Sequence, residues 1–103
     1  MNKYQHWMVY SSNVEGDILV DDGCKEALIN RKSLLAKGII GVNKSFKENS
    51  VVNICDKDGV KFARGSVTYD SNTIRITMGK SSKEIKEIAS KPIIHANNIV
   101  IGE

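Results

Sequence analysis

Basic side chains gather in one part of this sequence and are its best candidates for functional chemistry. Lysine and arginine recur between residues 25 and 37, and Arg64 follows on a later apolar run. Both residue types hold phosphate oxygens, so a cluster of them predicts a surface that could contact nucleic acid. The candidate RNA-binding residues are Lys25, Arg31, Lys32, Ser33, Lys37 and Arg64.

The alternative is that these charges are simply solvated. Charged residues make up 26% of the chain and the net charge is only +3, which permits a nucleic-acid partner without requiring one. Aromatic residues make up 6%, with no interleaved platform on which bases could stack. Acidic residues near the cluster would also dilute it: Asp21, Asp22 and Glu26.

Catalytic and metal chemistry have little support in the sequence. The glycines never form the phosphate cradle that a kinase needs. Asp21 and Asp22 are better explained as helix caps than as metal ligands, because adjacent acids at a strand end point to opposite sides. His6 and His95 have no acid or nucleophile at a recognisable spacing. We therefore expect no enzyme activity, no cofactor and no metal in this chain.

Length and composition indicate a small globular domain. The chain has 103 residues, of which 41% are hydrophobic. No apolar stretch is long enough to span a membrane, and the polar N-terminus lacks a signal-peptide core, so we expect a cytoplasmic protein. Cys24 and Cys55 lack the spacing of a zinc site, and we expect both to be small buried hydrophobes.

The basic cluster is positioned by one strand–helix–loop–strand unit at residues 16–42. The apolar run 18–20 predicts a buried strand, and Asp21 or Asp22 is placed to cap a helix over about 23–30. Asn30 is the predicted left-handed stop of that helix. A loop ending at Gly38 leads to a second apolar strand at 39–42.

The remaining elements are mostly strands. Two β-rich runs, 51–55 and 60–69, flank a glycine-containing turn and predict a hairpin, within which Gly65 indicates a bulge or a close backbone approach. Residues 73–78 are ambiguous between a strand, which their β-branched residues favour, and a short helix. Ser81 to Glu84 form a capping box ahead of a short helix that ends at Pro92, and 93–101 closes the sheet. Residues 1–13 are a lead-in segment or an edge strand.

Several motifs, in order from about residue 6 to residue 100, resemble the C-terminal PUA domain of glutamate 5-kinase. They are DDG-x-x-x-AL, KSLL-x-x-GI, ARG-x-V-x-Y, a Ser-Ser-x-Glu-Ile helix start and IH-x-x-N-x-V. The resemblance implies one PUA domain over residues 1–103, a mainly β pseudo-barrel of five or six strands with two short helices. It also implies a short helix near 73–78.

The resemblance further implies a non-catalytic accessory domain, partnered with a kinase domain in cis or in trans in proline biosynthesis. The alternative is a free-standing protein that binds structured RNA, since other PUA domains contact RNA with the first helix and its loop. The chain departs from the kinase pattern in two places: Ala36 replaces a usual proline, and Ala96-Asn97 replace Arg-Asp.

Overall fold

The fold is built on a mixed sheet of five strands with the order β2-β1-β3-β4-β5. The computed structural model describes residues 13–102, so the predicted lead-in segment lies outside the described residues apart from Asn13. Strands β1 and β3 are parallel, and every other neighbouring pair is antiparallel. The strands are β1 (Val14–Val20), β2 (Ile39–Asn43), β3 (Val51–Cys55), β4 (Lys61–Ser66) and β5 (Ile99–Ile101). The predicted mainly β pseudo-barrel class is confirmed.

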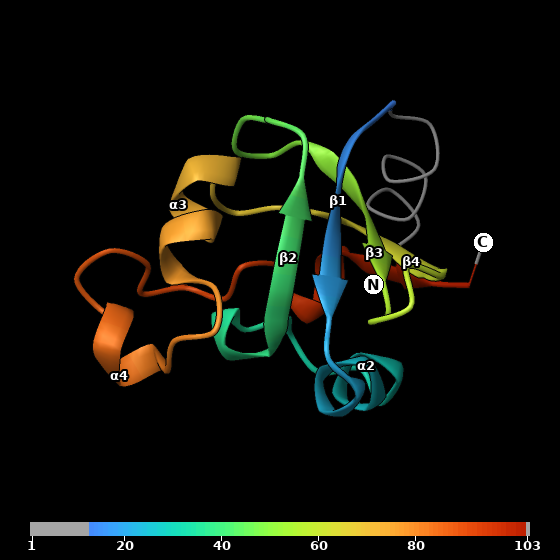
Figure 1. Cartoon of the computed structure of the whole chain (residues 1–103), viewed down its shortest axis with the longest axis horizontal. Helices are drawn as coiled ribbons and strands as arrows, with labels where there is room; N and C mark the ends of the chain where they lie inside the picture. Colours follow the sequence, from blue (N-terminus) through green and yellow to red (C-terminus); the bar gives the residue numbers. More distant parts are fainter. Residues whose placement is uncertain (1–12, 103) are drawn as a thin grey trace.

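The main core is largely aliphatic, and a second, smaller buried cluster consists of Val51 and Val100 with Val14 packed against it. On β1, Gly16, Ile18 and Val20 are buried while their neighbours are more exposed, as expected for a strand that covers a core with one face. Figure 1 shows α2 (Asp22–Ile29) beyond the end of β1, and α3 (Ser71–Thr77) and α4 (Ser82–Ile85) on the far side of β2. None of the described helices is long and apolar enough to cross a membrane.

Helix α2 begins where the sequence predicts. The Asp21 side chain accepts a hydrogen bond from the Cys24 backbone N–H at 2.7 Å, so Asp21 is the cap and Asp22 lies in the first turn. Helix α4 has the predicted capping box between Ser81 and Glu84.

The ambiguous segment near residues 73–78 is a helix, α3, and the strand alternative is wrong. Asp70 caps it by accepting from the Thr73 N–H at 2.8 Å. Ile74 and Thr77, three positions apart, are fully buried. A cap and a buried helical face therefore outweigh the strand preference of the β-branched side chains, which is a weak one.

Gly65 is required by a close approach and not by a bulge. It pairs regularly with Val52 and Ile99, and the register shift in this hairpin lies at Ile54/Cys55. A Cβ at position 65 would lie 3.0 Å from Ile94 Cγ2 and 3.1 Å from the Asn98 carbonyl oxygen. The predicted close approach is confirmed, and the alternative of a bulge at Gly65 is wrong.

The closing segment forms less strand than the sequence predicts. Leu34 and Ile94 make an isolated antiparallel bridge, a 3-10 turn η2 (Ala96–Asn98) follows, and only Ile99–Ile101 forms β5. This arrangement brings β5 opposite the end of α2.

Candidate functional site

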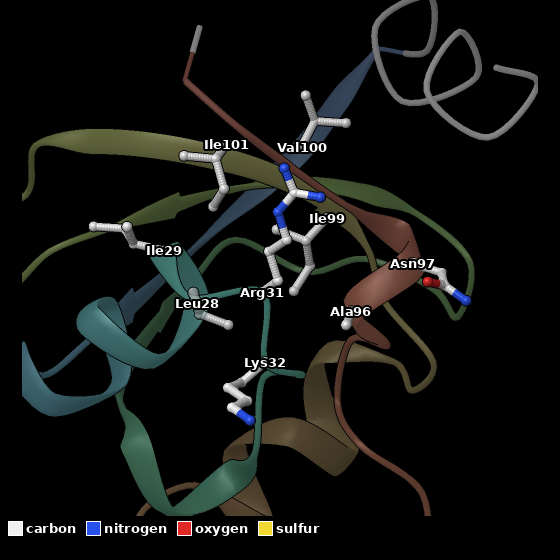
Figure 2. A pocket seen from close by; sticks show the side chains of 9 residues that line it. All are labelled: Leu28, Ile29, Arg31, Lys32, Ala96, Asn97, Ile99, Val100 and Ile101. Atoms are coloured by element: carbon white, nitrogen blue, oxygen red, sulfur yellow. The ribbon is translucent and has the colours of Figure 1, made fainter. Parts of the chain in front are cut away.

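A groove of about 590 Å³ separates the end of α2 from β5. Figure 2 shows the side chains that line it, with Arg31 and Lys32 coming from the segment after α2 and the others from both walls. The lining residues are Leu28, Ile29, Arg31, Lys32, Ala96, Asn97, Ile99, Val100 and Ile101.

The backbone that carries the two cations is held in place by the way α2 ends. The Arg31 N–H donates to the Leu28 carbonyl and the Lys32 N–H donates to the Ala27 carbonyl, both at 3.0 Å. This pair of bonds is a Schellman motif, which needs a left-handed residue just after the helix cap. That residue is Arg31, with φ 66°. The predicted stop at Asn30 is wrong, because Asn30 has φ −86° and is the cap itself.

Ser33 joins the two walls of the groove. Its hydroxyl oxygen accepts a hydrogen bond from the Ala96 N–H at 2.9 Å. Next to it, the Leu34 N–H donates to the Ile94 carbonyl at 2.9 Å. Ser33 therefore fixes η2 against the segment after α2 and does not line the groove.

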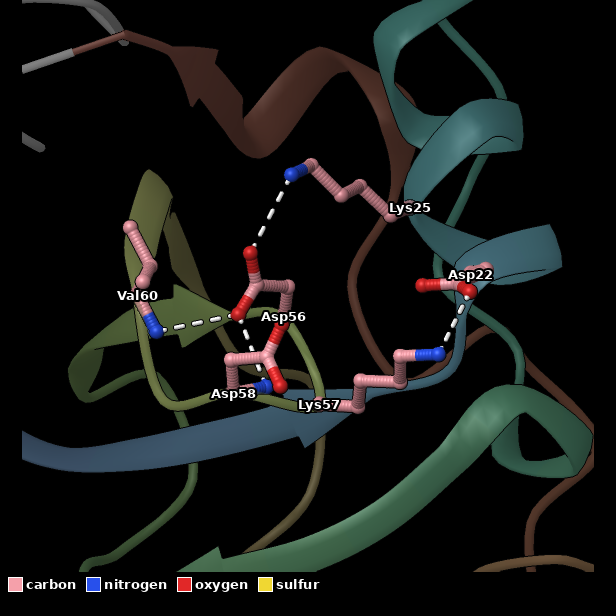
Figure 3. A network of polar contacts seen from close by, with 6 residues as sticks. All are labelled: Asp22, Lys25, Asp56, Lys57, Asp58 and Val60. Atoms are coloured by element: carbon pink, nitrogen blue, oxygen red, sulfur yellow. Dashed lines mark hydrogen bonds and ion pairs between the residues drawn. The ribbon is translucent and has the colours of Figure 1, made fainter.

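Lys25 is turned away from the groove and is paired. Its ammonium lies 3.2 Å from Asp56 Oδ2, in the turn between β3 and β4, and 5.2 Å from the centre of the Phe62 ring. Figure 3 shows this contact together with a second one, in which Lys57 lies 3.0 Å from Asp22. Lys25 thus joins α2 to the hairpin.

The Asp56 carboxylate is the centre of this network. The pKa of Asp56 is held below its usual value, first by the hydrogen bond that the Val60 N–H donates to its carboxylate. The contact with Lys25 and the hydrogen bond from the Asp58 N–H lower the pKa further, and burial opposes them. The ionised form is therefore the one that the turn stabilises.

Arg64 and Lys37 also lie outside the groove lining. Arg64 pairs with Asn53 and Val100 across the sheet, and its Nε atom is buried without a hydrogen-bond partner. Lys37 is exposed within the 3-10 turn η1 (Ala36–Gly38). Of the candidate RNA-binding residues, the structure brings only Arg31 and Lys32 together in the groove.

The aliphatic walls of the groove were not anticipated from the sequence. Ile29 is 51% exposed and Ile101 is 42% exposed, so both present apolar surface to solvent. One signal was available, since Ile29 lies outside the apolar stripe formed by Cys24, Ala27 and Leu28. A single exposed aliphatic residue is common on protein surfaces, so this signal alone could not have identified the groove.

The part of the chain that the structure describes shows neither an activated cysteine nucleophile nor a cluster of metal ligands. Burial, with a smaller effect of the Asp21 charge, raises the pKa of the Cys24 thiol to about 11. Cys55 is buried, as the sequence predicts, and Cys24 is half-buried against the core. Residues 13–102 contain no group of three or more histidine, cysteine or acidic side chains that could hold a metal ion.

The family is decided by a match over most of the strands and helices described above. The model of the PUA domain family matches residues 16–89. This chain belongs to the PUA domain family. The match contains all of β1 except its first two residues, and α2 with its Schellman motif, while β5 lies beyond it.

Curated relatives of this PUA domain are glutamate 5-kinases. The kinase of Dictyoglomus turgidum is 41% identical over 106 residues, which cover 98% of this chain and 29% of the relative. The kinase of Trichlorobacter lovleyi is 35% identical, with 98% and 28% covered. The predicted resemblance to the PUA domain of these kinases is confirmed, and the chain spans less than a third of their length.

Solved structures support the fold. A PUA domain from Aeropyrum pernix K1, crystallised as a tartrate complex, matches with a TM-score of 0.62 and 26% identity, over 79% of this chain and 41% of that one. A PUA domain protein from Thermoplasma acidophilum matches with a TM-score of 0.57 and 22% identity, over 75% of this chain and 52% of that one. The second likeness concerns the fold alone.

Proposed function

We propose that this chain is a non-catalytic accessory domain of a glutamate 5-kinase-like protein of proline biosynthesis in the cytoplasm, and that residues 1–103 form one domain. The observation that carries the proposal is the alignment of 98% of this chain with 29% of a kinase. Since the aligned region is a PUA domain, phosphoryl transfer would belong to the larger part of such a protein. The kinase domain would be its partner, in cis or in trans.

The chemistry of the described residues supports this division of labour. Phosphoryl transfer depends on phosphate-positioning loops, metal-binding carboxylates and well-placed cations. Asp21 and Asp70 serve instead as helix caps, and Asp56 organises a turn. These acids stabilise local structure in the domain.

A chimera tests the accessory role directly. The region of the Dictyoglomus turgidum kinase that aligns with this chain would be replaced by residues 1–103, and the chimera compared with a kinase lacking that region. We expect the chimera to recover thermal stability, or the native oligomer, that the truncated kinase loses. A chimera carrying Gly38→Val, which the fold cannot accommodate, is the matched control.

A second assay tests the absence of catalysis. The isolated chain, incubated with ATP, magnesium and glutamate, should form no γ-glutamyl phosphate above the blank. Turnover by the isolated chain, or a chimera no better than the truncated kinase, would refute the accessory role.

RNA binding is the second candidate function, and the placement of Arg31 and Lys32 favours it. Both cations are exposed at the groove, where backbone hydrogen bonds hold the chain that carries them. Lys37 adds a third exposed charge five residues after Lys32 in the chain. These residues could contact the phosphates of a structured RNA.

A further inference from the structure

Within residues 13–102, the groove contains the open edge of a β-sheet. Strand β5 is the last of the described strands in the sheet, and among them it pairs with β4 alone. Val100 lies opposite Arg64, and the Gly102 N–H donates to the Phe62 carbonyl at 2.8 Å. Alternate residues of an antiparallel pair bond to their partner, so the backbone groups of Val100 point towards β4. Those of Ile101 point away from it.

The outward backbone groups of β5 have no backbone partner among the described residues. The Ile99 N–H donates to the Ala96 carbonyl. The Ile99 carbonyl, the Ile101 N–H and the Ile101 carbonyl therefore remain on the open edge. Such a row of donors and acceptors is a template on which another extended chain can pair.

The walls of the groove indicate which kind of chain would fit. Among the described lining residues, six are aliphatic, two are cationic, and none is acidic or aromatic. Aliphatic walls suit aliphatic side chains, whereas single-stranded RNA is bound by several stacking faces, of which Arg31 is the one that the described lining offers. The cations favour a partner that carries negative charge.

We propose that this groove binds an extended peptide segment with alternating aliphatic and acidic side chains, which adds to β5 as a further strand. Side chains alternate across a strand, so one set contacts Ile29 and Ile101 while the other reaches Arg31 and Lys32. The Schellman motif fixes the backbone that carries both cations before the peptide arrives, which reduces the ordering of the chain that binding requires. The proposal is independent of the kinase assignment.

Fluorescence anisotropy with a labelled peptide of about eight alternating valine and glutamate residues tests binding to the full chain. We expect saturable binding, and none by a peptide in which lysine replaces glutamate. Two further peptides carry N-methyl groups on one or the other alternate set of residues. Only the set that faces β5 should abolish binding, because methylation removes the backbone donors needed for pairing. Equal effects of the two methylated sets would overturn strand addition.

Hydrogen exchange gives a readout at the strand itself. Addition of the valine–glutamate peptide should slow exchange of the Ile101 amide, which points to the open edge. The Val100 amide, already bonded to β4, should change little. Binding without protection of Ile101 would place the peptide elsewhere and refute the proposal.

Charge variants locate the acidic contacts. Arg31→Gln with Lys32→Gln should weaken peptide binding by about tenfold, the effect expected for two exposed ion pairs. Lys83→Gln with Lys86→Gln, at α4, is the matched control and should leave the affinity unchanged. Equal losses in both variants would indicate diffuse attraction.

Two competing occupants are separate outcomes that would overturn the proposal. Displacement of the peptide by a single-stranded RNA that binds more tightly would assign the groove to RNA. Sedimentation velocity at the same protein concentrations would detect a dimer, and a dimer abolished by Ile101→Ser would assign the groove to a second copy of the chain.

Discussion

The Lys25 ammonium lies 3.2 Å from the Asp56 carboxylate, which joins α2 to the β3–β4 turn across 31 positions of the sequence. The Asp56 side chain is only 12% exposed, so this pair is better shielded from water than most surface ion pairs. The contact explains why Lys25 is unavailable to a ligand in the groove.

The pH dependence of stability should report on Asp56. Its pKa is lowered in the folded protein, first by the Val60 N–H and then by Lys25. A lowered folded pKa adds stability above the unfolded value of about 4, and this contribution is lost as the pH falls through the folded pKa. Asp56→Asn keeps an acceptor but no charge. Urea unfolding should show it less stable than wild type at neutral pH and closer to wild type under acid conditions.

Asp58→Asn is the matched control for this experiment, since Asp58 is exposed in the same turn. The pKa values of Asp70 and Glu84 are also lowered by their capping hydrogen bonds, but they act equally in all three proteins. A constant gap between the wild-type and Asp56→Asn curves across the acid range would contradict the role of Asp56.

Gly38 should be the least replaceable residue of the loop after α2. A Cβ at this position would lie 2.4 Å from the Cys24 Cβ, a distance that α2 or the loop carrying Gly38 would have to shift to relieve. Gly38→Ala should therefore lower the free energy of unfolding by about 1–3 kcal/mol. Gly65→Ala, whose nearest contact would be 3.0 Å, should cost less.

A double-mutant cycle checks the cause. Cys24→Gly removes the clashing atoms at the cost of about 1 kcal/mol in helix propensity. In that background Gly38→Ala should become much less harmful, because the nearest remaining atom would be the Cys24 Cα at 3.6 Å. Additive costs would show that the clash is not with Cys24.

Local patterns predicted most of the fold. The apolar run at 18–20, the Asp21 cap and the Ser81–Glu84 capping box each depend on residues within a few positions of one another, so they can be recognised in sequence. Helix α3 was undecided because burial of Ile74 and Thr77, which is a tertiary effect, decides between helix and strand there.

The candidate site was less predictable, for the same reason. Arg31 and Lys32 are adjacent in the sequence, and both line the groove. Lys25 does not, because it pairs with Asp56 in a turn that lies far from it in the sequence. The second wall comes from β5, whose position opposite α2 depends on the Ser33–Ala96 and Leu34–Ile94 contacts. Sequence spacing contains no direct signal for contacts between segments so far apart.

The backbone conformation of Arg31 should cost stability, while its charge should contribute to binding in the groove. Its φ of 66° lies in the left-handed region, which glycine adopts at lower cost than a residue with a side chain. Arg31→Gly should raise the free energy of unfolding by about 0.5–1 kcal/mol while weakening the binding of any anionic ligand in the groove. Thermal unfolding and peptide titration of one sample measure both effects. Lower stability in Arg31→Gly would mean that the arginine side chain stabilises the fold by its own contacts.

RNA binding by this domain, where it occurs, should be electrostatic and should involve few phosphates. Lys25 is paired, which leaves Arg31, Lys32 and Lys37 as the exposed cations near the end of α2. Three phosphate contacts predict a slope of about −2 for log K against log salt with single-stranded RNA. Replacing all three cations by glutamine should remove most of that slope, as measured by titration at several salt concentrations. Replacing Lys83, Lys86 and Lys91, which lie on and after α4, should change it little. If the control variant loses as much affinity as the test variant, the attraction is spread over the whole basic surface and the region around Arg31 is not an RNA site.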